Sequence, residues 1–451
     1  MSIRKKRILL LLPEGTTIRN FLTTNIIQHI LDNSNAEVVC AVNNPSRYSS
    51  LFVDPRVTYV DFYRRRSLSF QTLLLSIIRS RFLSINENKS LEIFRRSLPY
   101  YKTENLLRQP FPKSKIILKF FEKIQKIFFF HLKQVERQIN EINPDLIFST
   151  HLIKRDEYDY LMIAKSNNIP TLGMVKSFDN VTGKGHFAFK PESVIVWNKI
   201  MEKELVDLYG YKKENIVITG VPQFDLYKED PQISRKEFFE NINLDPNKKT
   251  ILYATNSEFL GVDDFFNVEF IQSNLNDMNA QLIVRVHFGD NLNRYSKTDF
   301  KNVYFQVPGI EEGLSSNERV AHKNFISELR DTLFFSDVTI NTASTMTLDA
   351  IACGKPVINI FFDWEKREYL KSVKRFYDLI HYEPIVRFNK KNMANSKEDL
   401  IHLIRHSLNS PNADREVRRN IEDLMLAGNL SDASQQIASC VIDKAVSKSE
   451  H

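Results

Sequence analysis

Short apolar runs alternate with segments of helical periodicity along much of the chain. Near the start, apolar runs at residues 8–12, 37–42 and 57–62 predict strands, and apolar positions at helical spacing between 18 and 32 predict one helix. A strand, a helix and a strand in this order are typical of a parallel, doubly wound sheet. We therefore expect an α/β protein.

The same alternation resumes after residue 143 and continues to the C-terminus. It predicts strands at 145–149, 171–175, 194–197, 216–219, 250–254, 281–286, 303–306, 338–340 and 357–361, and helices at 155–167, 199–209, 263–275, 322–334, 346–353, 396–407, 415–427 and 431–447. The pattern restarts beyond GVPQFD, where glycine and proline favour a connection. We expect two facing Rossmann-like domains with a cleft between them, at 1–222 and 223–430. Residues 431–451 are a last helix and tail that can cross back onto the first domain.

Between residues 62 and 143 the pattern is helical and basic. SLSFQTLLLSIIRSRFL at 67–83 and KIILKFFEKIQKIFFFHLKQVERQI at 115–139 predict two helices. On the second helix, an apolar stripe that includes Phe120 and Phe128 lies beside lysines such as Lys119. Two interpretations are open: a helix at the interface of an anionic membrane, or a helix packed on the sheet with a solvated lysine face.

The distribution of charge favours the membrane. The chain of 451 residues has a formal net charge of +7. Residues 62–137 alone hold seventeen Lys and Arg against five Glu, a local balance of +12. Such a concentration of one sign indicates a partner of the opposite sign.

The cysteines and the lengths of the apolar stretches lead us to expect a cytoplasmic protein, peripheral on the inner face of the membrane. Cys40, Cys353 and Cys440 lie far apart and form no CxxC pair, which is typical of reduced thiols. No stretch reaches the roughly 20 apolar residues that span a bilayer. The basic residues 4–7 are followed by only five apolar residues, too few for a secretory signal.

The stretch SDVTINTASTMTLDAIACGKPVINIFF, residues 336–362, combines a strand, a hydroxyl-rich turn, a helix and a strand. Thr342, Ser344 and Thr345 lie where the helix would begin, and free backbone N–H groups at a helix N-terminus favour a phosphate. Ser344 could instead be only an N-cap. Gly354 is expected to end the helix at positive φ.

Two other predicted strands of this half end in polar residues as well. Thr255 and Asn256 follow the strand 250–254, while Arg285 and His287 end the strand 281–286 and alternate, so both point to one side. Because parallel strands end at one edge of a sheet, we expect these residues to meet the hydroxyl turn and to form a bed for a diphosphate. Asp349, one helical turn further on, could accept hydrogen bonds from ribose hydroxyls, or be a surface residue near a helix N-terminus.

Several of these segments resemble a known family in sequence and order. They are VITGVPQFD (217–225), ILYATN (251–256), IVRVH (283–287) and SDVTINTASTMTLDAIACGKPVINI (336–360), supported more weakly by SFDNVTGKG (177–185) and VIVWN (194–198). The chain resembles the nucleotide-sugar glycosyltransferases of the GT-B fold, and within them the CDP-glycerol glycerophosphotransferase-like, surface-polysaccharide branch.

The resemblance implies a donor nucleotide in the C-terminal domain and an acceptor in the N-terminal one. His287, Thr342, Ser344, Thr345 and Asp349 match the family's donor-binding positions, and Thr255 and Asn256 match its phosphate-proximal turn. Two departures are visible. Asp349 stands where the family often has Glu, and 341–345 reads NTAST where the glycerophosphotransferases usually have Asp-Tyr-Ser-Ser. Sugar transfer is therefore expected rather than transfer of glycerol phosphate.

The general base should come from the N-terminal domain. Glu14, in the turn after the first strand, and Asp179, in the loop 177–185, are the candidates, with His186 as a third. Either carboxylate could instead cap a helix or hold a loop. No DxD motif stands where a divalent cation would be needed, so we expect neither a metal nor another cofactor, with the departing diphosphate stabilised by the site itself.

The leading hypothesis is a metal-independent glycosyltransferase acting on a lipid-linked or surface-glycan acceptor. The alternatives are a non-hydrolysing nucleotide-sugar 2-epimerase, which would need several clustered carboxylates, and a glycerophosphotransferase-like polymerase. A non-enzymatic nucleic-acid-binding protein ranks last, because the basic segment lacks the recognition motifs of that class. No nucleic-acid partner is expected.

Overall fold

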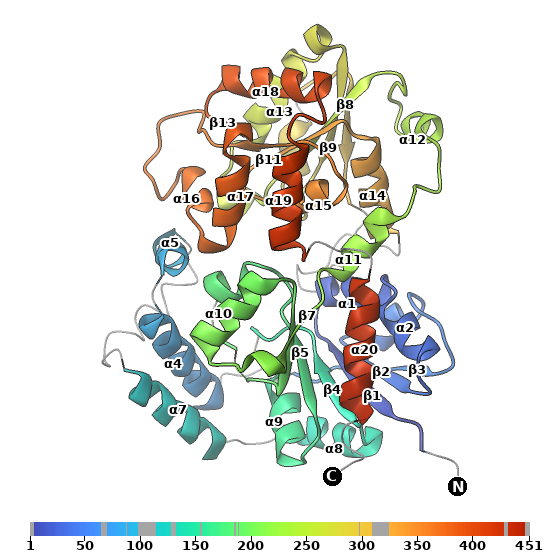
Figure 1. Cartoon of the computed structure of the whole chain (residues 1–451), viewed down its shortest axis with the longest axis vertical. Coiled ribbons are helices and arrows are strands. Elements are labelled where there is room, and N and C mark those ends of the chain that lie inside the picture. Colours follow the sequence, from blue (N-terminus) through green and yellow to red (C-terminus); the bar gives the residue numbers. More distant parts are fainter. Residues whose placement is uncertain are drawn as a thin grey trace. The chain divides into compact units, whose positions relative to one another are not determined.

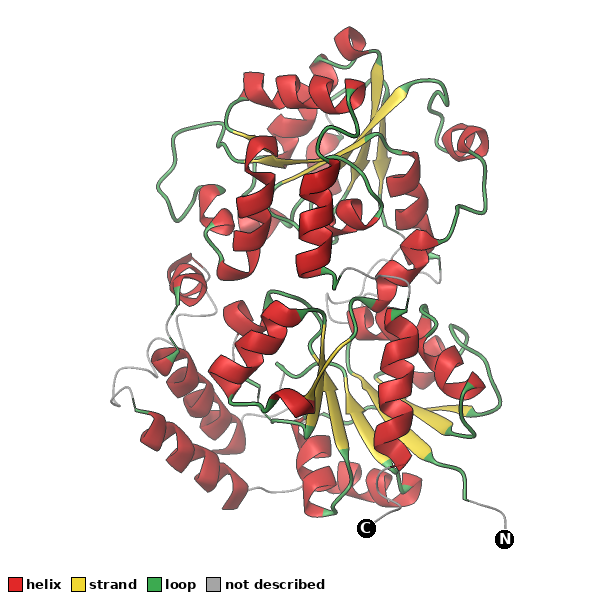
Figure 2. Ribbon diagram, in the orientation of Figure 1, coloured by secondary structure: helices red, strands yellow, loops and turns green. Residues whose placement is uncertain are grey.

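The computed structural model describes residues 4–64, 70–86, 88–97, 114–127, 132–153, 156–184, 186–187, 189–296, 298–308, 324–427 and 432–446. Contacts divide the chain into two compact units. Unit 1 comprises residues 1–222 and 432–451, and unit 2 comprises residues 223–431. Both are built from parallel strands and helices (Figures 1 and 2).

Unit 1 contains a seven-stranded parallel sheet in the order β3-β2-β1-β4-β5-β6-β7. The strands are β1 (Arg7–Leu12), β2 (Glu37–Val42), β3 (Val57–Asp61), β4 (Leu146–Ser149), β5 (Thr171–Met174), β6 (Ser193–Val196) and β7 (Ile216–Ile218). In the interior strand β1, Leu9 pairs with Val39 on one side and with Ile147 on the other. Both faces of the central strands are covered, which is why they appear in the sequence as continuous apolar runs.

Unit 1 also contains helices, and the last one returns to the sheet from the end of the chain. They are α1 (Gly15–Leu22), α2 (Ile26–Asp32), α3 (Pro45–Tyr48), α4 (Phe70–Ile85), α5 (Lys89–Ser97), α7 (Lys115–Ile127), α8 (Lys133–Ile142), α9 (Tyr158–Ser166), α10 (Lys199–Tyr209) and α20 (Ala433–Val446). Helix α20 packs beside α2 and against β4, so the C-terminal helix crosses back to unit 1 as the sequence predicts (Figure 1).

The single helix predicted at 18–32 is two helices, so this prediction was wrong. The interruption lies between α1 and α2, at Thr23, Thr24 and Asn25. Thr23 Oγ1 donates to the carbonyl of Arg19 at 2.7 Å, and Thr24 Oγ1 donates to that of Asn20 at 2.6 Å. Hydroxyls that bond the backbone in this way compete with the helical hydrogen bonds, and they account for the break.

The continuous helix predicted at 115–139 was also wrong. Helix α7 is described to Ile127, and Leu132 has extended backbone angles (φ −76°, ψ 104°) at the N-cap of α8. The two halves bury their apolar residues against different partners: α7 packs along α4, whereas α8 places Val135 and Ile139 in the core of the sheet. Phe128, part of the predicted stripe, lies outside the described residues.

Unit 2 contains a six-stranded parallel sheet in the order β10-β9-β8-β11-β12-β13. The strands are β8 (Lys249–Ala254), β9 (Ala280–Arg285), β10 (Val303–Gln306), β11 (Val338–Asn341), β12 (Val357–Ile360) and β13 (Met393–Ala394). Its helices are α11 (Pro222–Asp225), α12 (Arg235–Asn241), α13 (Asp264–Ser273), α14 (Phe325–Phe335), α15 (Met346–Ala352), α16 (Lys374–Tyr377), α17 (Glu383–Asn389), α18 (Lys397–Asn409) and α19 (Arg415–Met425), with α11 beginning on the last residue of unit 1.

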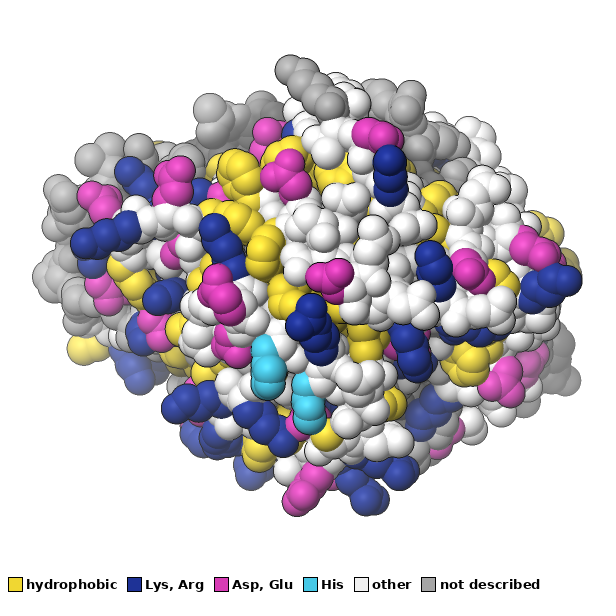
Figure 3. Space-filling model, turned by 90° about the horizontal axis from the view of Figure 1, so that it is seen from above, with side chains coloured by type: hydrophobic (Ala, Val, Ile, Leu, Met, Phe, Trp, Pro, Cys, Tyr) yellow, Lys and Arg dark blue, Asp and Glu magenta, His cyan; other side chains and the backbone are white. Residues whose placement is uncertain are grey.

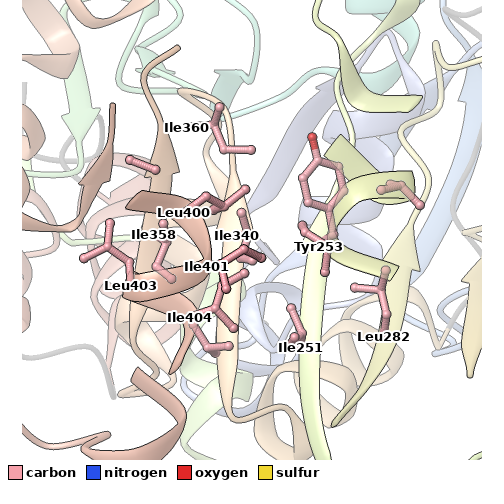
Figure 4. Packing of buried hydrophobic residues seen from close by; sticks show 14 of the residues in the cluster. Ile251, Tyr253, Leu282, Ile340, Ile358, Ile360, Leu400, Ile401, Leu403 and Ile404 are labelled. Atoms are coloured by element: carbon pink, nitrogen blue, oxygen red, sulfur yellow. The ribbon is translucent and has the colours of Figure 1, made fainter. Parts of the chain in front are cut away.

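The core of unit 2 is formed where α18 packs on the sheet. Leu400, Leu403 and Ile404 of α18 pack with residues of neighbouring strands such as Ile340 and Ile358 (Figure 4). The sequence prediction of an α/β protein with two Rossmann-like domains is therefore confirmed.

Surface charge is mixed on the face shown in Figure 3, where basic and acidic side chains alternate over short distances. In the sequence, by contrast, residues 62–137 contain many more basic than acidic residues. Within the described ranges, no helix is both long and apolar enough to cross a bilayer.

Candidate functional site

In unit 2 three neighbouring strands end in polar turns, and the turns after β8 and β9 are joined by hydrogen bonds. Strands β9, β8 and β11 are adjacent and parallel, so their carboxyl ends lie at one edge of the sheet. The amide of Thr255 donates to the carbonyl of Arg285 at 3.1 Å, and the amide of His287 donates to Thr255 Oγ1 at 2.9 Å. The structure thus brings together the first two parts of the predicted diphosphate site.

Gly289 allows the two turns to approach closely. Its carbonyl accepts hydrogen bonds from the Glu258 amide at 2.9 Å and from Ser257 Oγ at 3.3 Å. A Cβ atom at position 289 would lie only 2.4 Å from Ser257 Oγ. Any larger residue would therefore displace the Ser257 side chain, whose hydroxyl donates to the Gly289 carbonyl.

The ring of His287 is held in one tautomer. The Gly289 amide donates to His287 Nδ1 at 2.9 Å, so in the neutral ring the proton resides on Nε2. Partial desolvation lowers the pKa of His287 below its ordinary value, which the nearby Asp290 opposes. At neutral pH this exposed side chain can thus present an Nε2–H donor to a ligand.

A buried carboxylate braces the turn after β8. Asp264 accepts hydrogen bonds from the Asn256 amide at 2.9 Å and from the Tyr253 hydroxyl at 2.6 Å. Arg294 lies 3.4 Å from Asp264 and 2.8 Å from Asp290, and so joins this brace to the segment after β9. Burial raises the pKa of Asp264 to about 6, because the hydrogen bonds recover only part of the cost of desolvating the charge.

The hydroxyl turn after β11 is supported by side chains around it. Ala343 adopts a left-handed backbone (φ 43°), and its amide donates to the Tyr377 hydroxyl at 3.1 Å. The Ser344 amide donates to Asn341 Oδ1 at 3.1 Å. Thr345 directly precedes α15 with helical backbone angles, and Ser344 Oγ accepts from the Met346 amide at 3.3 Å. The Ser344 side chain therefore caps the start of the helix, which is the alternative that the sequence left open beside a phosphate ligand. Gly354 follows α15 at positive φ, as predicted.

Beneath this turn lies a buried network of polar side chains. Asn341 Oδ1 accepts from Thr347 Oγ1 at 3.1 Å and from Asn359 Nδ2 at 3.2 Å, and Thr347 also bonds the Tyr382 hydroxyl at 2.9 Å. The aromatic residues near 377–382 therefore support the turn from inside the fold, a role that the sequence analysis missed.

Several buried donors at these strand ends have no hydrogen-bond partner within the described part of the chain. They are Asn256 Nδ2, Arg285 Nη2, Asn341 Nδ2 and Thr342 Oγ1. All four residues lie at or just after the ends of β8, β9 and β11. A buried donor without a partner costs about 1–3 kcal/mol, so a concentration of them indicates a ligand that brings acceptor oxygens.

Arg285 and Asp349, two predicted ligands of the donor, also have partners in the protein. Arg285 Nη1 donates to Gln306 Oε1 at 2.6 Å and to Glu328 Oε1 at 3.0 Å. Burial lowers the pKa of Arg285, and the Glu328 carboxylate opposes that shift. Asp349 is buried and accepts a hydrogen bond from the Tyr227 hydroxyl at 2.7 Å.

Unit 1 carries a second cluster, at the ends of β1, β4 and β5. Glu14 Oε1 lies 3.0 Å from His151 Nε2 and also forms an ion pair with Lys176. His151 follows β4 and Lys176 follows β5. Of these three residues the sequence analysis predicted only Glu14. The available signal was the position of the other two, just beyond the ends of buried parallel strands.

Behind His151 is a fully buried carboxylate. Glu157 accepts hydrogen bonds from the amides of Thr150 at 3.2 Å and His151 at 3.1 Å, and from the Ser149 hydroxyl. Burial raises the pKa of Glu157 to about 8, against the effect of these hydrogen bonds, and the nearby Glu14 raises it further. Glu157 therefore fixes the backbone that carries His151.

Replacing Glu157 with glutamine is expected to remove one component of the pH dependence of stability. The folded protein holds this proton up to about pH 8, whereas the unfolded chain releases it near 4.5. The Glu157 contribution to the free energy of unfolding therefore falls as the pH rises from 4.5 to 8 and is constant above that. Urea denaturation across this range measures the change. Glu214→Gln, at an exposed site of unit 1, should retain the full pH dependence of the free energy of unfolding. The same pH dependence in Glu157→Gln would contradict the raised pKa of Glu157.

The other two predicted bases, Asp179 and His186, follow β5 and have other contacts in unit 1. Asp179 forms an ion pair with Lys184 at 2.6 Å and accepts from Asn180 Nδ2 at 2.7 Å. The segment predicted as an open loop forms a π-helical turn at Asn180–Lys184, mostly buried, with Gly185 outside the described residues. His186 lines a cavity with residues of α7 and α9. Among the described residues, no cluster of three or more His, Cys, Asp or Glu side chains could hold a metal ion.

Known proteins resemble this chain in sequence or in fold. The model of the family "CDP-Glycerol:Poly(glycerophosphate) glycerophosphotransferase" matches residues 142–443, well over half of the 451-residue chain. No curated protein sequence matches significantly.

Solved structures with a similar fold include UDP-GlcNAc 2-epimerases and a wall teichoic acid polymerase. The UDP-GlcNAc 2-epimerase of Neisseria meningitidis bound to UDP-GlcNAc has 11% identity and a TM-score of 0.55, over 97% of this chain and 100% of that one. The Methanocaldococcus jannaschii UDP-GlcNAc 2-epimerase in complex with UDP-GlcNAc and UDP has 11% identity and a TM-score of 0.53, over 97% and 99%. The wall teichoic acid polymerase TagF, as a single-residue variant soaked with CDPG, has 15% identity and a TM-score of 0.50, over 100% and 91%. At these identities the likeness concerns the fold alone.

Proposed function

Because the chain belongs to the CDP-glycerol:poly(glycerophosphate) glycerophosphotransferase family and has the Rossmann-like units of GT-B enzymes, we propose that it transfers a group from a nucleotide-diphosphate-linked donor to a hydroxyl of a lipid-linked or surface-glycan acceptor. The observation that carries the proposal is the set of buried, unpartnered donors at the ends of β8, β9 and β11. Donors gathered at the carboxyl edge of a parallel sheet suit the oxygens of a diphosphate.

In this proposal the unit 2 site binds the donor. Thr255, Asn256, Thr342, Ser344 and Thr345 surround the phosphates with hydroxyl, amide and backbone N–H groups. His287 donates through Nε2–H, and Arg285 supplies positive charge through Nη2, the nitrogen without a partner in the described chain. Asp349 accepts from the ribose hydroxyls, with its carboxylate oriented by Tyr227.

The unit 1 cluster accepts the proton of the acceptor hydroxyl. In this proposal a hydrogen bond from His151 Nε2–H to Glu14 makes Nδ1 the basic nitrogen of the neutral ring. Glu14 then orients the imidazole and stabilises its charged form, as the carboxylate of a catalytic triad does. Glu14 is thus a positioning residue in this scheme, and His151 is the base.

Donor chemistry defines two candidate reactions. In sugar transfer, which the NTAST turn favours, the acceptor oxygen attacks the anomeric carbon and a nucleoside diphosphate leaves. In glycerophosphate transfer, which the family match favours, the oxygen attacks the β-phosphorus of CDP-glycerol and CMP leaves. Both reactions deliver the acceptor proton to the base. We propose that neither requires a metal ion, so activity should be unchanged by EDTA.

A thermal-shift series tests the donor proposal. UDP-, GDP- and CDP-linked sugars and CDP-glycerol are each added to the protein, and a donor that binds the native state raises its melting temperature in a concentration-dependent way. Stabilisation by at least one of them is expected. If none stabilises the protein, the donor site is wrong; if a UDP-sugar is epimerised without acceptor, the transferase proposal is wrong.

Thr342→Val is expected to weaken nucleotide binding by about 10- to 100-fold, the value of one hydrogen bond to a charged group. The Thr342 hydroxyl has no partner among the described residues, so its loss should not lower stability. Thr339→Val is the matched control, because the Thr339 hydroxyl is equally buried and unpartnered within the described chain but lies inside β11. Isothermal titration with the stabilising nucleotide measures both. Equal affinity of the two variants would contradict the assignment of Thr342.

We also propose that the protein is cytoplasmic and binds the inner face of an anionic membrane through its basic helices between residues 67 and 139. On α7, Ile116 is 80% exposed and Phe120 is 58% exposed, and Leu73 of α4 is 50% exposed. Lys115, Lys119 and Lys123 are exposed on the same helix α7. Apolar side chains for the acyl boundary beside lysines for anionic headgroups are typical of interfacial helices.

Charge reversal on α7 tests this membrane proposal. The triple variant Lys115→Glu, Lys119→Glu and Lys123→Glu is expected to reduce binding to phosphatidylserine vesicles by about 100-fold, since each lysine near the surface contributes about 1 kcal/mol. A control reverses three exposed lysines of unit 1 elsewhere, at positions 203, 212 and 213. Vesicle sedimentation measures the binding. Equal loss in both triple variants would show a general charge effect and reject α7 as the docking element.

A further inference from the structure

The hydroxyl turn after β11 contains a strained residue. Ala343 has a left-handed backbone (φ 43°), which few residues other than glycine, asparagine and aspartate adopt. In the part of the chain that the structure describes, most non-glycine residues at positive φ are asparagines, whose side chains can bond the local backbone. Alanine has no such group. Contacts from elsewhere in the fold must therefore impose this conformation on Ala343.

Tyr377 provides the contact at Ala343 itself. Its hydroxyl accepts a hydrogen bond from the Ala343 amide at 3.1 Å and donates one to the carbonyl of Ile360, the last residue of β12, at 2.7 Å. Only a protonated phenol can accept and donate in this way. Tyr377 is buried, and this burial raises its pKa well above the ordinary value, so the hydroxyl keeps its proton.

Neighbouring groups fix the position of Tyr377, which is the last residue of α16. Arg375 of the same helix donates through Nη2 to the carbonyl of Leu260, in the segment after β8, at 2.8 Å. The rings of Phe361 and Tyr382 pack edge-on against Tyr377, with centroids 5.1 and 5.5 Å from its own. Helix α16 therefore joins the segments that follow three strands of the sheet, β8, β11 and β12.

The conformation of Ala343 sets the relative position of two hydroxyls of the donor site. Ala343 separates Thr342, whose buried Oγ1 has no partner in the described chain, from Ser344, whose Oγ caps α15. A change from a left-handed to an ordinary backbone at this residue redirects the chain between them. The two hydroxyls would then lose the separation that the structure gives them.

We propose that Tyr377 is a positioning residue for the donor, because it holds Ala343 in the left-handed conformation that presents the hydroxyls of Thr342 and Ser344 to the diphosphate. The inference rests on the proposed function, since it assumes the donor site of unit 2. It adds a residue that acts through the turn rather than by contact with the donor. In a purely structural role, by contrast, the Tyr377 hydroxyl would stabilise the fold and the conformation of Ala343 would not affect binding.

Isothermal titration of the full-length protein with UDP, GDP and CDP tests the proposal, because these probes contain the nucleoside diphosphate of the candidate donors. Tyr377→Phe keeps the ring and removes the hydroxyl. Ala343 should then relax to an ordinary backbone, and affinity for the nucleotide that the wild type binds should fall about tenfold. Tyr211→Phe is the matched control and should bind like the wild type, because the buried Tyr211 hydroxyl also donates to a backbone carbonyl, that of Pro191 in unit 1.

Glycine at position 343 separates positioning from general stabilisation. Because glycine adopts positive φ without strain, Ala343→Gly added to Tyr377→Phe should restore most of the lost affinity. If the hydroxyl only stabilised the fold, glycine would make the turn more flexible and would restore nothing. Ala343→Val keeps the test decisive if Tyr377→Phe does not fold. A β-branched residue is strongly disfavoured at positive φ, so this variant should also weaken binding.

Unchanged affinity in Tyr377→Phe or in Ala343→Val would overturn the proposal, and so would a double variant that binds no better than Tyr377→Phe. A wild-type protein that binds none of these nucleotides would reject the donor site, and the positioning role with it. Failure of the positioning role alone, with a wild type that binds, is therefore distinguishable from failure of the proposed function.

Discussion

His151→Asn is expected to lower kcat by about 10²- to 10⁴-fold, the contribution of a positioned general base. Asparagine retains a polar side chain but cannot accept the proton of the acceptor hydroxyl at neutral pH. Nucleotide binding should be unchanged, since the donor residues belong to unit 2 and His151 belongs to unit 1. Steady-state transfer kinetics and nucleotide titration on the same sample measure the two effects.

Two further variants separate the base from the residue that orients it. Glu14→Gln keeps a hydrogen-bond acceptor for His151 Nε2–H but removes the negative charge, so kcat should fall less than in His151→Asn. His29→Asn, on α2 of the same unit, should behave like the wild type. Full activity of His151→Asn would show that His151 is not the general base. A fall in nucleotide affinity without a fall in kcat would show that His151 binds the donor instead.

Asp264→Ala is expected to lower the free energy of unfolding by about 3–5 kcal/mol. The substitution leaves the Asn256 amide and the Tyr253 hydroxyl without their buried acceptor and removes one partner of Arg294. Because the same carboxylate holds the turn after β8, nucleotide affinity should fall as well. Urea denaturation and isothermal titration measure the two effects.

Asp277→Ala provides the control, because Asp277 is exposed in the same unit and its loss should change stability by less than about 0.5 kcal/mol. Suppose instead that Asp264→Ala lowers the free energy of unfolding by less than about 1 kcal/mol. The cost of burying the charge would then cancel the stabilisation by its hydrogen bonds. The pKa of Asp264, raised by burial to about 6, reflects that cost. The brace would then position the turn without stabilising the fold.

Strands were predictable from the sequence and the ends of some helices were not. Buried parallel strands such as β1 and β9 consist mainly of apolar residues, and little else produces such short runs. The ends of helices depend on which hydrogen bonds and packing contacts compete with the helical backbone. The hydroxyls of Thr23 and Thr24 interrupt an otherwise continuous helical pattern, and the apolar residues of α7 and α8 are divided between two packing partners.

The two candidate sites also differ in how much of them the sequence predicted. In unit 2, strand ends that are separate in sequence could be joined in advance because neighbouring parallel strands share one edge. In unit 1 the position of His151 just beyond a strand end was a similar signal, but its pairing with Glu14 joins two strands that are distant in sequence and could not be predicted from either one alone. The supporting roles of Tyr377 and Tyr382 were hidden for the same reason, because both side chains act on a turn distant in sequence.

The most direct test of transfer is to identify the nucleotide released from a labelled donor in the presence of a membrane or glycan acceptor. Wild-type protein is expected to move the label to the acceptor and to release one nucleotide for each group transferred, and His151→Asn should not. A nucleoside diphosphate identifies sugar transfer, and CMP from CDP-glycerol identifies glycerophosphate transfer. Label that stays on the nucleotide, or a donor sugar epimerised without any acceptor, would contradict the proposed function.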